Sequence, residues 1–403
     1  MTLSRLFHIL FDTKIAIFKF AEETIEAIIF HAEIRKRERK CSCCGSTKVH
    51  QKDSKNRTFR GCNLGGRKTF LKFTTYKFRC LNCHKTRWIN LPFTVGKLPM
   101  TRSFLNYIIS QVAMSTIQKV AESLDLQWKT IKNIDKANLK KRKKQFSFKD
   151  LEYLSIDEIA IRKGHVYMTI ISNVATGQIV FAAKGRKEDA LKGFLKQLKY
   201  RAKRLKGIAI DMSAGYAALI KKYLPHVPII FDRFHVTKVL NKAVDDLRKA
   251  ECKKYRDQGL DIGKGDRFLL LRNFDDLDND EKSSLEKLFE INRDIAIAHT
   301  MKEQFRVFWD CKTRNEGSDF LIHWCVQAHL SGITQLKKAA KTLIRHSGGL
   351  LNYFDHRITN GKAEGINNKI KVMKRQSYGF RDIEYFILKL YNLHKTRHVL
   401  LGV

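Results

Sequence analysis

Alternating apolar and polar positions predict a group of short strands in the centre of the chain. β-Branched residues within 151–161 predict a first strand, and 166–174 and 178–183 continue the pattern after two turns. Helical and buried-strand patterns then alternate. These further elements are expected at 187–206 (helix), 207–210 (strand), 213–224 (helix), 227–231 (strand) and from Phe234 onward (helix). The resulting βββαβαβα order predicts a mixed sheet that is covered by helices.

The amino-terminal third of the chain has a different pattern. A short amphipathic start and two extended segments, 15–20 and 24–34, precede a strand-like stretch at 69–78. From Thr101 the apolar spacing becomes helical. Three helices are expected there, one around Phe104, Tyr107, Ile108 and Val112, and two others at 117–124 and 128–138.

The last two of these helices have the spacing of a helix-turn-helix, whose final helix enters the major groove of DNA. Its exposed face is expected to carry Lys129, Thr130, Lys132 and Asn133. A purely structural three-helix bundle gives the same spacing, so both interpretations stay open. The basic run Lys140–Lys144 predicts a solvated linker that can lie along phosphates.

A long helical stretch separates the last predicted strand from the carboxyl-terminal part of the chain. The segments 238–257, 281–312 and 318–346 have helical periodicity, which predicts a helical insertion at about 238–346. Its expected packing residues are Phe305, Phe308, Trp309, Trp324 and Leu330.

Length and charge limit the kinds of partner that the chain can have. Its 403 residues suffice for several domains, which we expect at 1–40, 41–95, 100–144 and 150–403. The chain carries 78 Lys and Arg against 40 Asp and Glu, a formal net charge of +38 that extends along its whole length. This charge favours a nucleic acid as the partner.

The sequence contains no pattern that indicates membrane insertion or secretion. No run approaches the roughly 18 apolar residues that a membrane-spanning helix needs. The start contains Arg5 and a short apolar patch, without the long apolar core and cleavage site of a signal peptide. We therefore expect an intracellular, cytoplasmic protein.

Four of the nine cysteines are spaced like the ligands of a structural zinc ion. Cys41 and Cys44 form one C-x-x-C knuckle, and Cys80 and Cys83 form a second one after 35 intervening residues. Paired thiolates at this spacing each cover one side of a tetrahedral zinc ion. The separation exceeds the usual ~15–20 residues of short fingers and requires a longer hairpin between the knuckles. Cys43 leaves the ligand choice in the first knuckle open, and free or disulfide-bonded thiols are the alternative.

Three acidic residues occupy positions that a sheet of this order can bring together. Asp157 lies in the first strand, Asp211 ends the fourth strand, and Glu364 lies in a late helix. The order of elements is that of the ribonuclease H-like fold, in which the first and fourth strands are neighbours. Clustered carboxylates repel one another unless a cation neutralises them, so the three predict a site for divalent metal ions. Glu158 points to the opposite face by alternation, and Asp189 is less suitably placed.

The helix that contains Glu364 has two distinct faces. Glu364, Asn368, Lys371 and Arg375 recur at intervals of four, three and four residues, so they share one face. The packed face carries Ile366, Ile370 and Met373. The first face therefore offers a carboxylate for metal beside amide and cationic groups for phosphates. A basic surface helix with an incidental Glu is the simpler alternative.

Six motifs follow one another along the chain: CSCCG, CLNCH, SIDEIAIRKGHVYMTI, IAIDMSAGY, IIFDRFHV and TNGKAEGINNKIKVMKRQSYGF. Together with the helix-turn-helix pattern, they resemble the insertion-sequence transposases of the ISL-three type over nearly the whole chain. The resemblance implies a zinc ribbon, a helix-turn-helix and a ribonuclease H-like catalytic domain, in a prokaryotic protein that is associated with the nucleoid. It also implies a DDE catalytic triad, which maps here onto Asp157, Asp211 and Glu364.

The same resemblance implies metal-dependent cleavage and transfer of DNA strands. Two Mg²⁺ (or Mn²⁺) ions about 3.5–4 Å apart would activate the attacking oxygen and stabilise the leaving oxygen. The zinc ribbon and helix-turn-helix would bind the terminal inverted repeats, with the protein as a homodimer or larger assembly on double-stranded DNA. Asp232 and His235 also match, and Asp232 is expected either to cap the next helix or to support the site.

Two other function classes share part of this pattern. A non-catalytic DNA-binding regulator would have the charge, the zinc knuckles and the helix-turn-helix, but the three acidic residues argue against it. A structure-specific nuclease would have the acidic residues and the metal, and would release broken ends without joining them.

Overall fold

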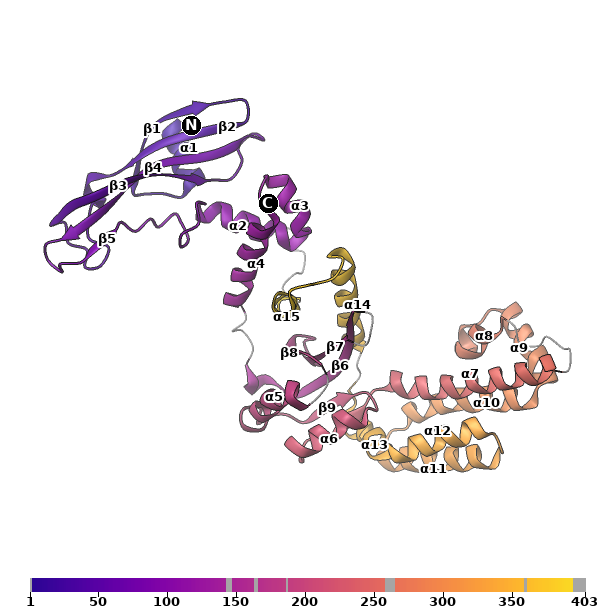
Figure 1. Cartoon of the computed structure of the whole chain (residues 1–403). Coiled ribbons are helices and arrows are strands. Elements are labelled where there is room, and N and C mark those ends of the chain that lie inside the picture. Colours follow the sequence, from indigo (N-terminus) through magenta and orange to yellow (C-terminus); the bar gives the residue numbers. More distant parts are fainter. Residues whose placement is uncertain are drawn as a thin grey trace. The chain divides into compact units, whose positions relative to one another are not determined.

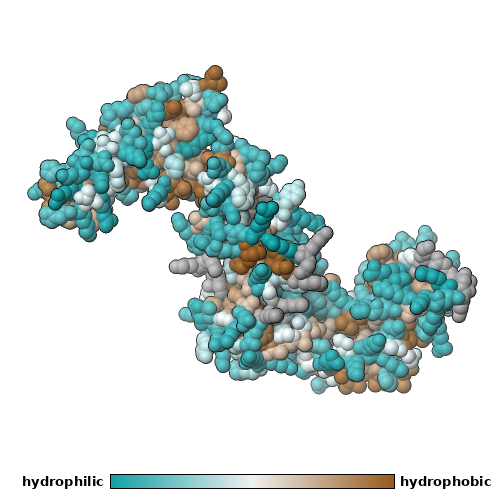
Figure 2. All heavy atoms as spheres, viewed as in Figure 1, coloured by the Kyte–Doolittle hydropathy of each residue, from teal (hydrophilic) through white to brown (hydrophobic). Residues whose placement is uncertain are grey.

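The structure is a computed structural model that describes residues 2–142, 147–162, 166–185, 188–257, 265–358 and 361–393. The chain forms two compact units, and the first ends at Arg142 (Figure 1). No helix within the described ranges is long and apolar enough to cross a membrane. Hydrophilic residues cover most of the face that Figure 2 shows.

The first unit contains a five-stranded sheet with the order β1-β2-β4-β3, in which β5 also pairs with β4. Its strands are β1 (Ala16–Glu23), β2 (Ala27–Ile34), β3 (Val49–Arg60), β4 (Lys68–Cys80) and β5 (Thr86–Trp88). The amphipathic start forms α1 (Leu3–Phe11), and the fully buried Phe7 and Phe11 pack against Phe30 of the sheet. A Cβ at Gly61 would lie 2.8 Å from the Phe11 ring, so glycine permits this close packing.

Three helices complete the first unit: α2 (Arg102–Met114), α3 (Ile117–Leu124) and α4 (Trp128–Arg142). Thr101 and Thr116 cap the first two helices with their hydroxyl groups. Asp125 ends α3 in the left-handed conformation with φ 51°, which makes the tight turn before α4. The expected linker is partly wrong, because α4 extends through Lys140 to Arg142. Lys143 and Lys144 lie outside the described residues.

The second unit contains a five-stranded sheet with the order β10-β9-β6-β7-β8. Its strands are β6 (Tyr153–Arg162), β7 (Val166–Asn173), β8 (Ile179–Lys184), β9 (Gly207–Ile210) and β10 (Ile229–Phe231). The first three strands are antiparallel, whereas β9 and β10 run parallel to β6. Two helices connect the later strands, α5 (Glu188–Arg201) and α6 (Ala214–Tyr223). The predicted mixed sheet with ribonuclease H-like strand order is confirmed.

The two faces of this sheet have separate cores. Leu154 and Ile156 of β6 face a large core that includes α5 and α6. Ile159 and Ile161, at alternate positions of the same strand, face a smaller core. Two late helices cover that smaller core, α14 (Gly361–Gln376) and α15 (Ile383–Tyr391). Asp157 lies two residues before Ile159 in β6, so its side chain points to the same face of the sheet, which α14 covers.

A helical insertion lies between β10 and α14. Its helices are α7 (Arg233–Asp257), α8 (Arg267–Leu271), α9 (Asn279–Ile291), α10 (Arg293–Gln304), α11 (Arg314–Leu330), α12 (Thr334–Arg345) and α13 (Ser347–His356). The insertion returns to the sheet through α13, where the Asn352 amide donates to the Ile229 carbonyl at 2.8 Å. Gly349 allows this contact, since a Cβ there would lie 2.4 Å from the Phe231 ring.

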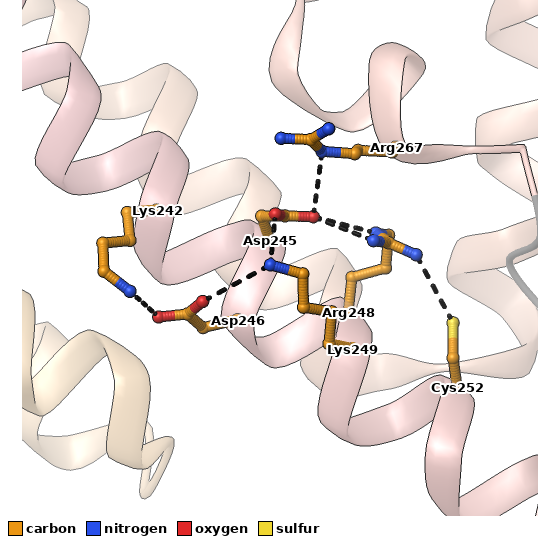
Figure 3. A network of polar contacts seen from close by, with 7 residues as sticks. All are labelled: Lys242, Asp245, Asp246, Arg248, Lys249, Cys252 and Arg267. Carbon is orange, nitrogen blue, oxygen red and sulfur yellow. Dashed lines mark hydrogen bonds and ion pairs between the residues drawn. The ribbon is translucent and has the colours of Figure 1, made fainter. Parts of the chain in front are cut away.

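The insertion is held together by buried aromatic rings and by buried charge. Four expected packing residues are buried, Phe305, Phe308, Trp309 and Trp324, whereas Leu330 is 71% exposed. The expectation for Leu330 was wrong because it lies on the exposed side of the last turn of α11, whereas Ala328 in the same turn is buried. Figure 3 shows that the buried carboxylate of Asp245 on α7 contacts Arg248, Lys249 and Arg267, the first residue of α8. The nitrogen–oxygen distances are 2.9, 2.8 and 3.4 Å, respectively. The contacts neutralise a buried charge and tie α8 to α7.

Candidate functional site

The four cysteines of the two knuckles converge at one point in the first unit. The sulfur atoms of Cys41, Cys44, Cys80 and Cys83 all lie within 4.8 Å of one another. The Cys41 and Cys83 sulfurs are 3.6 Å apart, and those of Cys44 and Cys80 are also 3.6 Å apart. The long antiparallel pair β3 and β4 supplies the hairpin that brings the second knuckle back to the first. Four thiolates in this arrangement match the donor set of a closed structural zinc site.

Backbone N–H groups in the first knuckle favour the charged form of one of the four thiols. The N–H groups of Cys44 and Cys43 lower the pKa of Cys41 to about 6. Cys43 itself is exposed, and its sulfur lies 3.6 Å from the Lys85 ammonium, outside the group of four. The ligand choice that the sequence left open in the first knuckle therefore favours Cys41.

In the second unit, β6 and β9 bring Asp157 and Asp211 to the same level of the sheet. Ser155 pairs with Ala209 in these parallel strands, and Asp157 and Asp211 each lie two residues farther along the chain, Asp211 directly after the end of β9. Burial raises the pKa of Asp211, and the charge of Asp157 adds to this rise, while the Ser213 backbone N–H opposes it. The two carboxylates are therefore close enough to influence each other.

Both oxygens of the Asp157 carboxylate accept hydrogen bonds. Oδ1 accepts the backbone N–H of Glu158 at 2.7 Å, and Oδ2 accepts the side-chain amide of Asn367 on α14. The ammonium groups of Lys362 and Lys374 donate to the carbonyls of Ala175 and Ala160, at opposite ends of α14. The contacts of Asn367 and Lys374 hold α14 along β6, and the contact of Lys362 ties the first turn of α14 to the turn after β7. Glu158 points to the opposite face, where burial and this carboxylate raise the pKa of Tyr216.

Glu364 is exposed in the first turn of α14, one turn before Asn367. It thus begins the helix that contacts Asp157. Its carboxylate does not join a close ligand group, because the four cysteines are the only such group among the residues that the structure describes. Asn368, Lys371 and Arg375 are exposed on the same helix, whereas Ile366 and Ile370 are buried, as their spacing predicted.

The sequence interpretation missed Asn367. The helical pattern placed Asn368 on the face of Glu364, and Asn367 falls between that face and the packed one. A signal was nevertheless present, since an amide at the edge of a packed face can reach the neighbouring strand.

Asp232 and His235 lie beside Asp211 at the start of α7. Phe231 of β10 pairs with Ile210 of β9, and Asp232 and Asp211 are the next residues after this pair. Asp232 Oδ1 accepts the backbone N–H of Phe234 at 3.3 Å, while Oδ2 lies 3.2 Å from Nδ1 of His235. The carboxylate therefore caps the helix and orients the imidazole, so the two alternatives for Asp232 are compatible.

The four residues on α4 that are predicted to contact DNA differ in their exposure to solvent. Lys129 and Asn133 are exposed, whereas Thr130 and Lys132 are half-buried. The Lys132 ammonium lies 5.5 Å from the centre of the Trp128 ring. The helices α2, α3 and α4 share one core around Phe104, which fits both a helix-turn-helix and a purely structural three-helix bundle.

Sequence comparisons identify the family. The sequence model of ISL3 transposases, described as "Transposase", matches residues 154–390, which is more than half of the chain. The chain belongs to this transposase family. A second model, described as "zinc-finger of transposase IS204/IS1001/IS1096/IS1165", matches residues 37–83 of this transposase and includes all four clustered cysteines.

Two bacterial relatives agree with this assignment. The transposase for insertion sequence element IS1001 of Bordetella parapertussis is 31% identical over 355 residues, 87% of each chain. The transposase for element IS1557 of Mycobacterium tuberculosis is 23% identical over 378 residues, covering 87% of this chain and 84% of that protein. A solved structure of the Drosophila P element transposase strand transfer complex matches with a TM-score of 0.40 and 12% identity, covering 74% of this chain and 92% of that one.

Proposed function

We propose that this transposase cuts and joins DNA strands at a metal site formed by Asp157, Asp211 and Glu364. The observation that carries the proposal is the contact between Asn367 and Asp157. It attaches the helix that bears Glu364 to β6, and Asp211 directly follows β9, the strand next to β6.

The residues fit a divalent cation. Asp157 and Asp211 repel each other, and the half-buried position of Asp211 gives little water to relieve the repulsion. Magnesium or manganese ions, when bound, would activate the attacking oxygen and stabilise the leaving oxygen of the phosphoryl transfer. Asn367 would orient Asp157 without occupying all its lone pairs, because each carboxylate oxygen can accept more than one contact. Asp232 would hold His235 beside Asp211 as a supporting group.

Recognition of the terminal inverted repeats would belong to the zinc ribbon at 41–95 and the helix-turn-helix at 100–144. The exposed Lys129 and Asn133 on α4 are suited to the major groove. On α14, Lys371 and Arg375 would contact phosphates beside the cutting site and would add affinity without sequence preference. Two or more copies would act together on double-stranded DNA at the nucleoid.

The test is incubation of the full chain with terminal-repeat DNA and Mg²⁺, scored for cleavage and for strand joining. We expect both products, with cleavage confined to the repeat end. Cleavage without joined product would favour a structure-specific nuclease. Specific binding without any cleavage would favour a regulator that does not act on the strands.

A further inference from the structure

A polar cleft with a volume of about 530 Å³ lies in the first unit, away from the helix-turn-helix. It opens between β3, β4 and the segment 88–97 that follows the second zinc knuckle. Three cations line it, Lys55, Arg57 and Lys97, together with the indole of Trp88. All its lining residues belong to the described part of the chain, and no acidic residue is among them.

The sheet register places the cleft residues on one face. Lys55 pairs with Thr75, Arg57 pairs with Phe73, and Trp88 pairs with Lys77 of the same strand β4. Because residues two apart in a strand share a face, the two cations and the indole lie on the same side of the sheet.

The segment after β5 forms the other wall. Phe93 packs edge-on against Phe59 and Phe73, with ring centres 5.4 and 5.6 Å apart, which anchors the segment over this face. Gly96 has φ 61°, a left-handed conformation that turns the chain so that Lys97 borders the cleft.

Trp88 is held in the cleft by the zinc knuckles. It follows Cys83 by five residues, and the Ser42 hydroxyl of the first knuckle donates to its carbonyl at 3.2 Å. Its side chain is nevertheless 40% exposed, whereas Trp309 and Trp324 are buried. Sites for single-stranded nucleic acid combine two components. Cations lie along the phosphate backbone, and an exposed aromatic ring stacks against a base.

We propose that this cleft binds an unpaired stretch of a DNA strand, with phosphates on Lys55, Arg57 and Lys97 and one base stacked on Trp88. The inference rests on the proposed function, because strand breaks at an element end create nucleotides that can leave the duplex. A fully paired duplex keeps its base faces covered and offers the cleft only phosphates. Trp88 therefore distinguishes unpaired from paired DNA.

The experiment compares three labelled DNAs of the same sequence, a blunt terminal-repeat duplex, the same duplex with a single-stranded overhang, and the single strand. Their affinities for the zinc-loaded full chain are measured without Mg²⁺. Trp88→Ala is expected to weaken binding of the overhang and the single strand about tenfold, the scale of one stacked base. Blunt-duplex affinity should stay within about twofold, and Trp88→Phe should restore most of the loss.

Charge variants and a matched control test the phosphate contacts. For single-strand binding, the logarithm of the affinity falls linearly with the logarithm of the salt concentration. Lys55→Ala and Lys97→Ala should each make this slope shallower by about 0.7. Lys72→Ala removes an exposed cation from the opposite face of β4 and should leave the slope unchanged. Zinc content, measured for every variant, shows that the knuckles are intact.

Equal losses for blunt and overhang DNA, or no loss in zinc-loaded Trp88→Ala, would overturn the proposal. Either result can occur while the parental chain still cuts and joins terminal-repeat DNA, so the cleft can fail without the proposed function. Conversely, Trp88-dependent binding of unpaired DNA by a chain that cuts nothing would support the cleft and count against the catalytic assignment.

Discussion

The two candidate metal sites of this transposase are assembled to different degrees. In the first unit, the four cysteine sulfurs lie within 4.8 Å of one another. In the second unit, Asp157 lies in β6, Asp211 directly follows the adjacent strand β9, and Glu364 is exposed on the helix whose Asn367 contacts Asp157.

The difference follows from where the ligands lie along the chain. Each C-x-x-C turn supplies two thiols locally, and one hairpin brings the two turns together. The three acidic residues come from two strands and a helix that are far apart in sequence, so their positions depend on how these elements pack. The comparison teaches that short turns can gather a ligand set by themselves, whereas ligands from distant elements depend on tertiary packing.

The strongest test of this comparison removes each acidic residue in turn. Asp157→Asn, Asp211→Asn and Glu364→Gln keep the shape of the side chain and remove the charge that binds metal. We expect cleavage with Mg²⁺ to fall on the order of 10³-fold or more in each variant, with DNA affinity nearly unchanged. Asp189→Asn, an exposed acidic residue, is the control. Parental cleavage rates in all three variants would refute the triad.

A second test breaks the preassembled site. Cys44→Ser should abolish zinc binding and unfold the region from β3 to β5, because structural zinc contributes about 10–16 kcal/mol in small zinc-dependent folds. Metal analysis and hydrogen exchange of the full chain measure both effects, and exchange in β6 to β9 should not change. Cys43→Ala should retain one zinc ion per chain. Loss of zinc in that control would mean that the ligand set is wrong.

A third test loosens the attachment of the Glu364 helix. Asn367→Ala removes the amide that orients Asp157, so we expect the Mg²⁺ concentration for half-maximal cleavage to rise about tenfold or more. Gln376→Ala removes an exposed amide from the end of the same helix and should have no effect. A lower rate at saturating Mg²⁺, with the metal requirement unchanged, would indicate a different role for Asn367.

The smallest expected effect concerns the stability of the metal-free protein. Because burial raises the pKa of Asp211, its ionised form destabilises the fold at neutral pH, and Asp211→Asn should raise the Tm by about 1–3 °C. As the pH falls through the raised pKa, the parental carboxyl becomes protonated and the difference should disappear. Added Mg²⁺ should reverse the order at neutral pH by stabilising only the parent. Calorimetry that shows a less stable variant at neutral pH would contradict this account.

Elements with local signals were predictable from the sequence. The bounds of β9 and α3 agree with those expected from a short buried run and from a capped helical pattern. Boundaries without a local signal were less accurate. The helix expected at 187–206 ends at Arg201, and the strand expected from Val227 begins at Ile229. Tertiary packing decides such ends, and no single residue type marks them.

The residues of the candidate sites also divide into those with a local sequence signal and those without one. The C-x-x-C spacing indicated the four clustered cysteines, since their geometry depends on short turns. Asn367 could not be identified from spacing alone, because its partner Asp157 is 210 positions away and the contact depends on how α14 lies along β6. The cleft at Trp88 was missed for a related reason, since it requires the register of two strand pairs and the segment that Phe93 anchors.

The position of the helical insertion has a consequence for how the protein is made. At a synthesis rate of about 5–20 residues per second, the 152 residues between Asp211 and Glu364 delay the third acidic residue by roughly 8–30 s. During this time the nascent chain already contains the zinc ribbon and the helix-turn-helix. A chain that stops within the insertion keeps these parts and lacks Glu364. Under the proposed assignment, such prematurely terminated products would bind element ends and would lack one of the acidic residues that cleavage needs.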